Sequence, residues 1–253
     1  MTRPTLALAA LLALLGACAE PPDTTAALLE RMLARYESNR GAIGGFVATG
    51  GGAEATHGAL PDSAATLDLP AIAPAGGATP DPQLVALLVQ QVPNVRLLAD
   101  TLRTAEMDGP RDLRGHRVYI LTRPAAAPGA PTLYVVVDAE TFDVREIEQS
   151  VAPDSLERPL VSRLVYDDFR AVDGFTAPFR VRQINEGVDQ FIPDTERIVR
   201  GGQASVARGQ VEQMPAGPER EARRATLDRD IRLYTRGEQE TDLRIERLRV
   251  VPR

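Results

Sequence analysis

The side chains that most often ligate metals or act as nucleophiles are scarce in this 253-residue chain. It contains one cysteine, Cys18, and two histidines, His57 and His116. A single cysteine excludes a disulfide within the chain and a zinc site built from several cysteines. Two histidines that lie far apart in the sequence argue against a histidine-rich metal site and against a catalytic triad. We therefore expect neither a metal nor a cofactor.

Carboxylates gather in two predicted turns. They are Asp138, Glu140 and Asp143 in the first turn, and Asp167, Asp168 and Asp173 in the second. Either group could bind a cation or supply the carboxylate pair that acid–base catalysis uses. Acids in turns more often cap local backbone or face solvent, and Ser38, Ser63 and Ser162 lie in no nucleophile-elbow motif. We therefore predict that the protein is not an enzyme, because a hydrolase would need a clustered catalytic set.

The charges of the chain give little support to an anionic partner. The net charge is −6 and every basic residue is arginine. Nucleic-acid-binding proteins usually carry a basic surplus, so we expect no nucleic-acid partner. The arginines of residues 218–236 could meet lipid phosphates, but the interleaved acids favour a solvated face of mixed charge. These residues are Arg220, Arg223, Arg224 and Arg229, with Glu219, Glu221, Asp228 and Asp230.

The segment before Cys18 has the organisation of a signal peptide. Arg3 gives it a positive start, and residues 6–17 are almost entirely leucine and alanine. This run is shorter than the ~20 apolar residues of a membrane-spanning helix and fits a signal-peptide core. Leu15-Gly16-Ala17-Cys18 resembles the lipobox of bacterial lipoproteins, in which the chain is cut before the cysteine and the cysteine is acylated. An ordinary signal peptide that leaves a free thiol is the alternative.

The resemblance to lipoproteins implies a location and a domain organisation. Several acyl chains on one cysteine anchor a protein stably in a membrane. The residue after Cys18 is Ala19, whereas an aspartate there resembles an inner-membrane retention signal in enteric bacteria. We therefore expect an anchor in the outer membrane, at its periplasmic face. Residues 1–17 would be the signal peptide, 18–25 the lipidated tether and 26–253 a single domain.

Periodicity predicts three helices and a run of antiparallel strands. A helix follows Asp23, a second begins at Asp81-Pro82 and ends before Pro93, and a third covers residues 218–236. Strands are predicted at residues 116–121, 132–138, 143–149, 160–169, 177–185 and 242–251, and further strands near Ile192 and over residues 198–207. Asp173-Gly174 indicates a hairpin, and a phase change between Ile245 and Leu248 indicates a bulge. Residues 50–80 read as a loop or a loosely paired hairpin.

Three stretches resemble the outer-membrane lipoprotein-sorting family, which has the LolA/LolB-like fold. They are "GHRVYIL" (residues 115–121), "LYVVVDAETFDVREIE" (133–148) and "VYDDFRAVDGFTAPFRV" (165–181). The resemblance covers most of the chain after residue 25. It implies an α+β fold in which a strongly curved antiparallel β-sheet, an incomplete barrel, is closed by two or three helices. In that family the inner surface of the sheet forms an apolar cavity for acyl chains or lipid.

The resemblance implies a set of cavity residues and a function. The candidates are Leu84, Leu88, Leu121, Val135, Val137, Phe179 and Val181, and ordinary core packing is the alternative reading of the same residues. The leading hypothesis is a non-enzymatic, membrane-anchored lipoprotein that binds lipid or a lipoprotein acyl chain. The second is an envelope sensor or protein-interaction module on the same fold, with an envelope protein as its partner. Its contact surfaces would be the helix of residues 218–236 and the loop of residues 50–80.

Overall fold

The computed structural model describes residues 21–41, 43–58, 70–75 and 79–253. Over these residues the chain is an α+β protein with two antiparallel sheets and five α-helices. The helices are α2 (Thr25–Gly41), α3 (Pro82–Val89), α4 (Val95–Thr101), α5 (Asp194–Val211) and α6 (Pro218–Arg236), with a 3-10 turn, η1 (Val188–Phe191), before α5. The strands are β1 (Gly45–Gly50), β2 (Ala53–His57), β3 (Ala71–Pro74), β4 (Glu106–Leu113), β5 (His116–Arg123), β6 (Thr132–Asp138), β7 (Val144–Val151), β8 (Leu160–Val172), β9 (Phe175–Glu186), β10 (Glu238–Arg244) and β11 (Arg247–Val251).

The larger sheet is a meander of seven strands in the order β10-β9-β8-β7-β6-β5-β4. Strands β8 and β9 form its longest hairpin, and they turn at Asp173-Gly174, as predicted. Both turn residues have positive φ, 49° and 81°, which matches the twist of the flanking strands. In β9, Phe175, Ala177, Phe179 and Val181 are buried, whereas Thr176 and Arg180 are partly exposed, so one face of this sheet is covered.

The smaller sheet has the order β11-β1-β2-β3 and joins the larger one through the end of the chain. The sequence predicted one bulged strand over residues 242–251, but β10 pairs with β9 while β11 pairs with β1. At the crossing the Ile245 N–H donates to the Phe179 carbonyl, and the Glu246 N–H donates to the Thr49 carbonyl. The phase change therefore marks the passage from one sheet to the other, and Ile245 and Leu248 are both buried.

Two further expectations are wrong, on sheet curvature and on the number of helices. In the described residues neither sheet is closed or strongly curled, so the incomplete barrel gives way to two open sheets. The described residues form five α-helices instead of two or three. One addition is α4, which follows Asn94, whose side chain accepts a hydrogen bond from the Leu97 N–H. The other is α5, which with η1 replaces the strands expected near Ile192 and over residues 198–207. The β-branched residues of α5 suggested strands, but Gly201 and Ala204 lie one helical turn apart and are both buried on α5.

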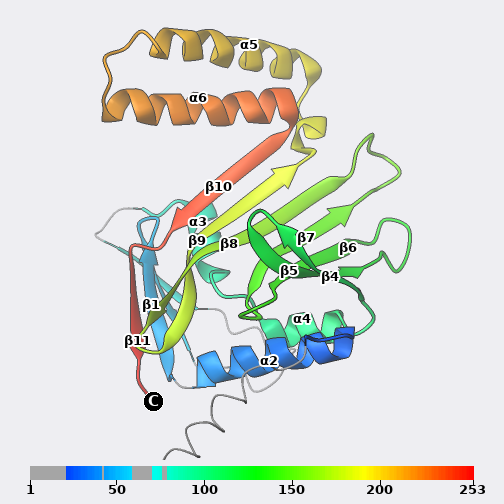
Figure 1. Ribbon diagram of the computed structural model, residues 1–253. Coiled ribbons are helices and arrows are strands. Elements are labelled where there is room, and N and C mark those ends of the chain that lie inside the picture. The colour runs from blue at the N-terminus through cyan, green and yellow to red at the C-terminus, as the bar shows by residue number, and fades with distance from the viewer. Residues whose placement is uncertain (1–20, 42, 59–69, 76–78) are drawn as a thin grey trace, which may run out of the picture.

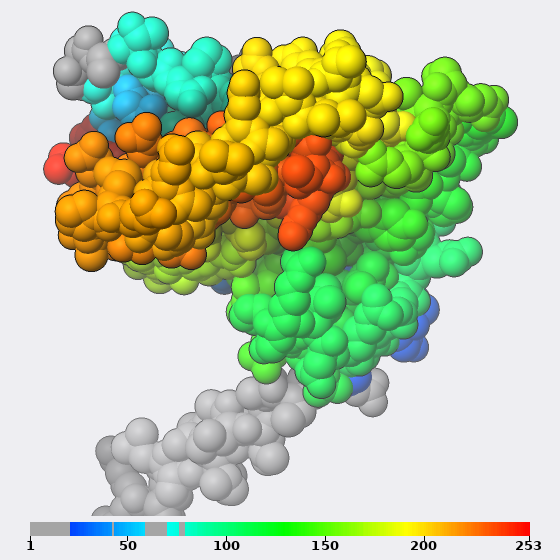
Figure 2. Space-filling model, turned by 90° about the horizontal axis from the view of Figure 1, so that it is seen from above, coloured from blue at the N-terminus to red at the C-terminus, as the bar shows by residue number. Residues whose placement is uncertain are grey.

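Helices α5 and α6 lie at one end of the molecule and α2 and α4 at the other, with α3 between them beside β10 (Figure 1). Helices α2, α3 and α4 pack on the sheets and complete a hydrophobic core that includes Leu28, Leu88 and Leu121. Helices α5 and α6 pack against each other beyond the ends of β9 and β10. Figure 2, which looks down on this second pair, shows it as the outermost layer at its end of the molecule.

Candidate ligand-binding pocket

A pocket of about 470 Å³ lies between the α3–α4 segment and one face of the larger sheet. Val89, Val92, Leu97 and Leu98 line it from the α3–α4 side. Ile147 of β7 and Leu164 of β8 line it from the sheet, where they are direct cross-strand partners. The volume lies within the range of ~300–1,000 Å³ that small-molecule sites occupy. Pro93, which also lines the pocket, lies in the turn between α3, which ends at Val89, and α4, which begins at Val95.

One part of the pocket lining is polar and is built by Tyr36, Arg40 and His57. Tyr36 and Arg40 are four residues apart on α2, so they lie on one face of the helix, and their side chains form a hydrogen bond. An Arg40 Nη2 donates to the Gly58 carbonyl at 2.9 Å, and the guanidinium carbon lies 5.0 Å from the centroid of the Phe46 ring. His57, the last residue of β2, stacks on Phe46 with ring centroids 4.2 Å apart.

The burial of His57 determines its protonation. Desolvation, together with the nearby positive charge of Arg40, lowers the pKa of His57 to about 4, although the Leu88 carbonyl accepts a hydrogen bond from the ring. The imidazole is therefore neutral at pH 7. Among the described residues its Nε2 has no hydrogen-bond partner, so the bond to Leu88 assigns the proton to Nδ1. The pocket thus has a buried acceptor beside a buried cation.

A second depression, of about 670 Å³, lies between α2 and α4 and has a different character. Its lining includes Glu30, Glu37, Arg96, Asp100 and Arg103. The ion pair of Arg96 with Glu37 crosses it, and Arg103 pairs with Asp100 on the α4 side. Because charged groups resist transfer out of water, this surface is less suited to an apolar ligand than the pocket at α3–α4.

The seven cavity residues predicted from the sequence lie in or against the hydrophobic core. Leu88, Leu121, Val135, Val137 and Val181 are fully buried, Phe179 is 8% exposed, and Leu84 packs against this cluster. They are absent from the described lining of the α3–α4 pocket, which other residues provide. Cys18, the predicted lipidation site, lies outside the described residues.

The two carboxylate groups are dispersed into local contacts. Burial alone would raise the pKa of Asp138, but hydrogen bonds from Thr141, Arg145 and Glu140 hold it below its usual value. Asp143, Asp167 and Asp168 each pair with an arginine, namely Arg35, Arg182 and Arg170. In the described part of the chain, no three His, Cys, Asp or Glu side chains are grouped so as to hold a metal ion. His116 is exposed on β5 of the larger sheet, whereas His57 lies on β2 of the smaller sheet.

The polar end of the pocket was missed in the sequence, although a signal for it exists. Leu29, Met32, Tyr36 and Arg40 share one buried stripe of α2, so an arginine continues an apolar pattern. His57 likewise continues the buried alternation of Ala53 and Ala55 in β2. A charged or titratable residue in a buried stripe is costly unless it has a partner, which makes it a candidate for function.

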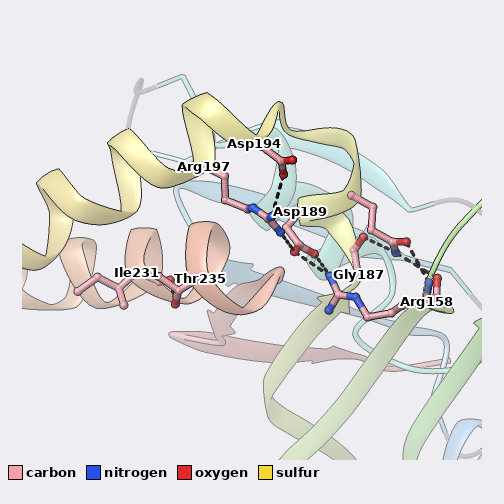
Figure 3. A network of polar contacts seen from close by, with 8 residues as sticks. Arg158, Gly187, Asp189, Asp194, Arg197, Ile231 and Thr235 are labelled. Carbon is pink, nitrogen blue, oxygen red and sulfur yellow. Dashed lines mark hydrogen bonds and ion pairs between the residues drawn. The ribbon is translucent and has the colours of Figure 1, made fainter.

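A buried ion-pair network joins the α5–α6 pair to the larger sheet (Figure 3). Asp189 of η1 accepts hydrogen bonds from Arg158, in the loop before β8, at 2.6 and 2.7 Å, and from Arg197 of α5 at 2.8 Å. Arg197 also donates to Asp194 at the start of α5. Gly237 ends α6 with φ of 67°, and a Cβ at this position would clash with the Asp189 carboxylate. This network fixes how the helix pair leaves the sheet.

The outer side of α5 is apolar and exposed. Ile198 is 72% exposed, Val199 55% and Val206 66%, and the shallow groove that they line contains only uncharged residues. Some of the charged residues of α6 form ion pairs at the contact with the segment that ends α5. Arg220 pairs with Glu212, and Asp228 pairs with Arg208. None of the helices in the described part of the chain combines the length and the hydrophobicity that a membrane-spanning segment needs.

Compared with known proteins, the chain matches no family model, no curated protein and no solved structure. The resemblance to the lipoprotein-sorting family therefore stays a prediction from three sequence stretches.

Proposed function

We propose that the protein is a lipoprotein, anchored at the periplasmic face of the outer membrane, that binds lipid or an acyl chain without catalysing a reaction. The observation that carries the proposal is the α3–α4 pocket, whose volume and apolar walls suit a hydrocarbon chain. Leu97, at 42% exposure, leaves apolar surface at the pocket that a bound chain would cover. Each buried CH₂ of such a chain would contribute about 0.8 kcal/mol.

The anchor and the pocket are compatible in distance. Helix α2 begins at Thr25, seven residues after Cys18. Seven residues span at most roughly 25 Å, so an acylated Cys18 would hold the start of α2 near the lipid surface. Tyr36 and Arg40, at the other end of the same helix, line the pocket. Lipid extracted from the membrane would have a short path to the site.

The direct test is to ask whether the protein carries lipid and where. The full chain with Cys18→Ser, purified without detergent, is expected to retain lipid that mass spectrometry detects. Leu97→Gln should weaken binding of a fluorescent acyl probe about fivefold, because it removes about 1 kcal/mol of apolar contact. Val206→Gln, an exposed apolar residue of α5, is the matched control and should leave the affinity unchanged. A chain that retains no lipid and binds no probe would overturn the proposal.

A second candidate function, a protein-interaction module, is favoured by the exposed face of α5. We place its contact surface on Ile198, Val199 and Val206 rather than on α6. The partner would be a protein with an apolar, uncharged surface, because the α5 groove has no charge to pair. A membrane is a poorer fit, because this helix pair lies at the end of the molecule opposite α2, which follows the tether (Figure 1).

A further inference from the structure

The polar end of the α3–α4 pocket offers two groups with opposite requirements. The Arg40 guanidinium can only donate hydrogen bonds and is always charged. Neutral His57 presents an acceptor, Nε2, which is buried and has no partner among the described residues. Both groups contact the ring of Phe46, and both side chains are more than nine-tenths buried. A ligand group that satisfies this end must therefore accept from one residue and donate to the other.

The described residues that line the pocket around His57 include no carboxylate. Helix α2 contributes Tyr36 and Arg40, the α3–α4 segment contributes the uncharged Gln90 and Asn94, and the sheet contributes Gln149 and Tyr166. Burial raises the pKa of both tyrosines, so they stay neutral at pH 7. Among the described residues that line the pocket, the charge that faces His57 is the positive charge of Arg40.

We infer that the ligand of this pocket is an amphiphile with a free carboxyl group, a fatty acid rather than an acyl ester, whose carboxyl group lies between Arg40 and His57. This inference rests on the proposed function, the binding of an apolar chain in the same pocket. A carboxyl group supplies an oxygen to accept from Arg40 and a proton to donate to Nε2. An ester supplies acceptors only and leaves Nε2 buried without a donor, which is costly.

The inference fixes the proton balance of binding. At pH 7 the free fatty acid is a carboxylate and free His57 is neutral, so the bound pair needs one proton that comes from the solution. That proton lies between His57 Nε2 and a carboxyl oxygen, and no covalent bond forms or breaks. Binding should therefore take up about one proton per ligand and become weaker as the pH rises, by roughly tenfold per pH unit at most.

The experiment compares laurate with methyl laurate on the delipidated full chain carrying Cys18→Ser. Titration calorimetry in two buffers of different ionisation enthalpy measures affinity and proton uptake together. We expect laurate to bind roughly tenfold more tightly than the ester, with uptake of one proton. His57→Phe keeps the ring that stacks on Phe46 and should abolish both the preference for the acid and the proton uptake. The control is His116→Phe. Because His116 is exposed on β5, this variant should behave as the parent chain.

The outcomes separate this inference from the proposed function. If acid and ester bind equally without proton uptake, the carboxyl site is wrong and the apolar pocket stands. If neither binds, the proposed function fails and the inference fails with it. If dodecyl phosphate binds more tightly than laurate, the headgroup is a phosphate and the carboxyl assignment is overturned. Should His57→Phe not fold, which circular dichroism would reveal, the acid-to-ester affinity ratio and the proton uptake of the parent chain decide.

Discussion

Asp189 is the residue through which the α5–α6 pair is held on the sheet. Its side chain is 4% exposed and forms ion pairs with both Arg158 and Arg197. These two positive charges compensate the free energy that burying the carboxylate alone would cost. The hydrogen bonds from Arg158 and Arg197 outweigh the effect of burial and keep the pKa of Asp189 below its usual value. The carboxylate is thus charged at any physiological pH.

We expect Asp189→Asn to lower the free energy of unfolding by about 2 to 3 kcal/mol, because two charge-assisted contacts lose their acceptor charge. Asp194→Asn is the matched control: Asp194 also pairs with Arg197, but it is 82% exposed and should cost about 0.5 kcal/mol or less. Urea denaturation at pH 7 measures both. Equal effects of the two variants would mean that the buried network does not hold the helix pair.

The stability lost in Asp189→Asn should depend on pH in a direction that follows from the lowered pKa of Asp189. A carboxylate whose pKa is depressed on folding stabilises the folded state above its unfolded pKa, and this contribution is lost as the pH falls through the folded pKa. The difference in stability between the parent chain and Asp189→Asn should therefore be constant near neutrality. It should shrink in acid, below the usual range of aspartate.

At the scale of elements, strands of the central meander could be predicted from the sequence because local pattern and tertiary burial agree there. The segment of residues 132–138 is β6 to the residue, and its Val135 and Val137 are buried on the core side. In residues 194–211 the local sequence pattern and the tertiary packing disagree, and the prediction failed there. Their β-branched residues favour a strand locally, but pairing with α6 and the ion pair of Arg208 with Asp228 select a helix.

The site was harder to predict than the fold for a related reason. The pocket lining draws on α2, β2, the α3–α4 segment, β7 and β8, which are distant in sequence. Tyr36, Arg40 and His57 come together only because β1, with Phe46, lies between their elements. Composition and spacing report which residues are buried, but not which buried residues face a cavity.

The exposed face of α5 is testable as an element. A photo-crosslinking residue at Ile198 or Val206 should capture one protein in the envelope, while the same residue at Arg223 on exposed α6 should not. The complex with that purified partner should then be lost in the Ile198→Asp, Val206→Asp double variant, because a buried charge without a partner opposes binding. Crosslinks to lipid alone, or equal crosslinking from Arg223, would contradict a protein-docking role.

At the scale of the whole molecule, the position of Cys18 predicts where the protein resides. Cys18→Ser should release it from the membrane fraction to the soluble periplasmic fraction, because it removes the only cysteine that can be acylated. Ala19→Ser, which keeps the cysteine, should leave the protein on the membrane. Fractionation followed by immunoblotting measures both variants, and a Cys18→Ser protein that stays on the membrane would refute the lipid anchor.

The passage of the chain from β10 to β11 governs when the protein can fold as well as how. Strand β11 pairs Val250 with Phe46, so the smaller sheet waits for the last residues to be synthesised. Until then β1 lacks one of its two neighbouring strands. Phe46 of β1, which contacts both Arg40 and His57, then lies at the edge of an incomplete sheet. A chain that stops before residue 247 lacks β11, and we expect it to lose the polar end of the pocket that Arg40 and His57 build on Phe46.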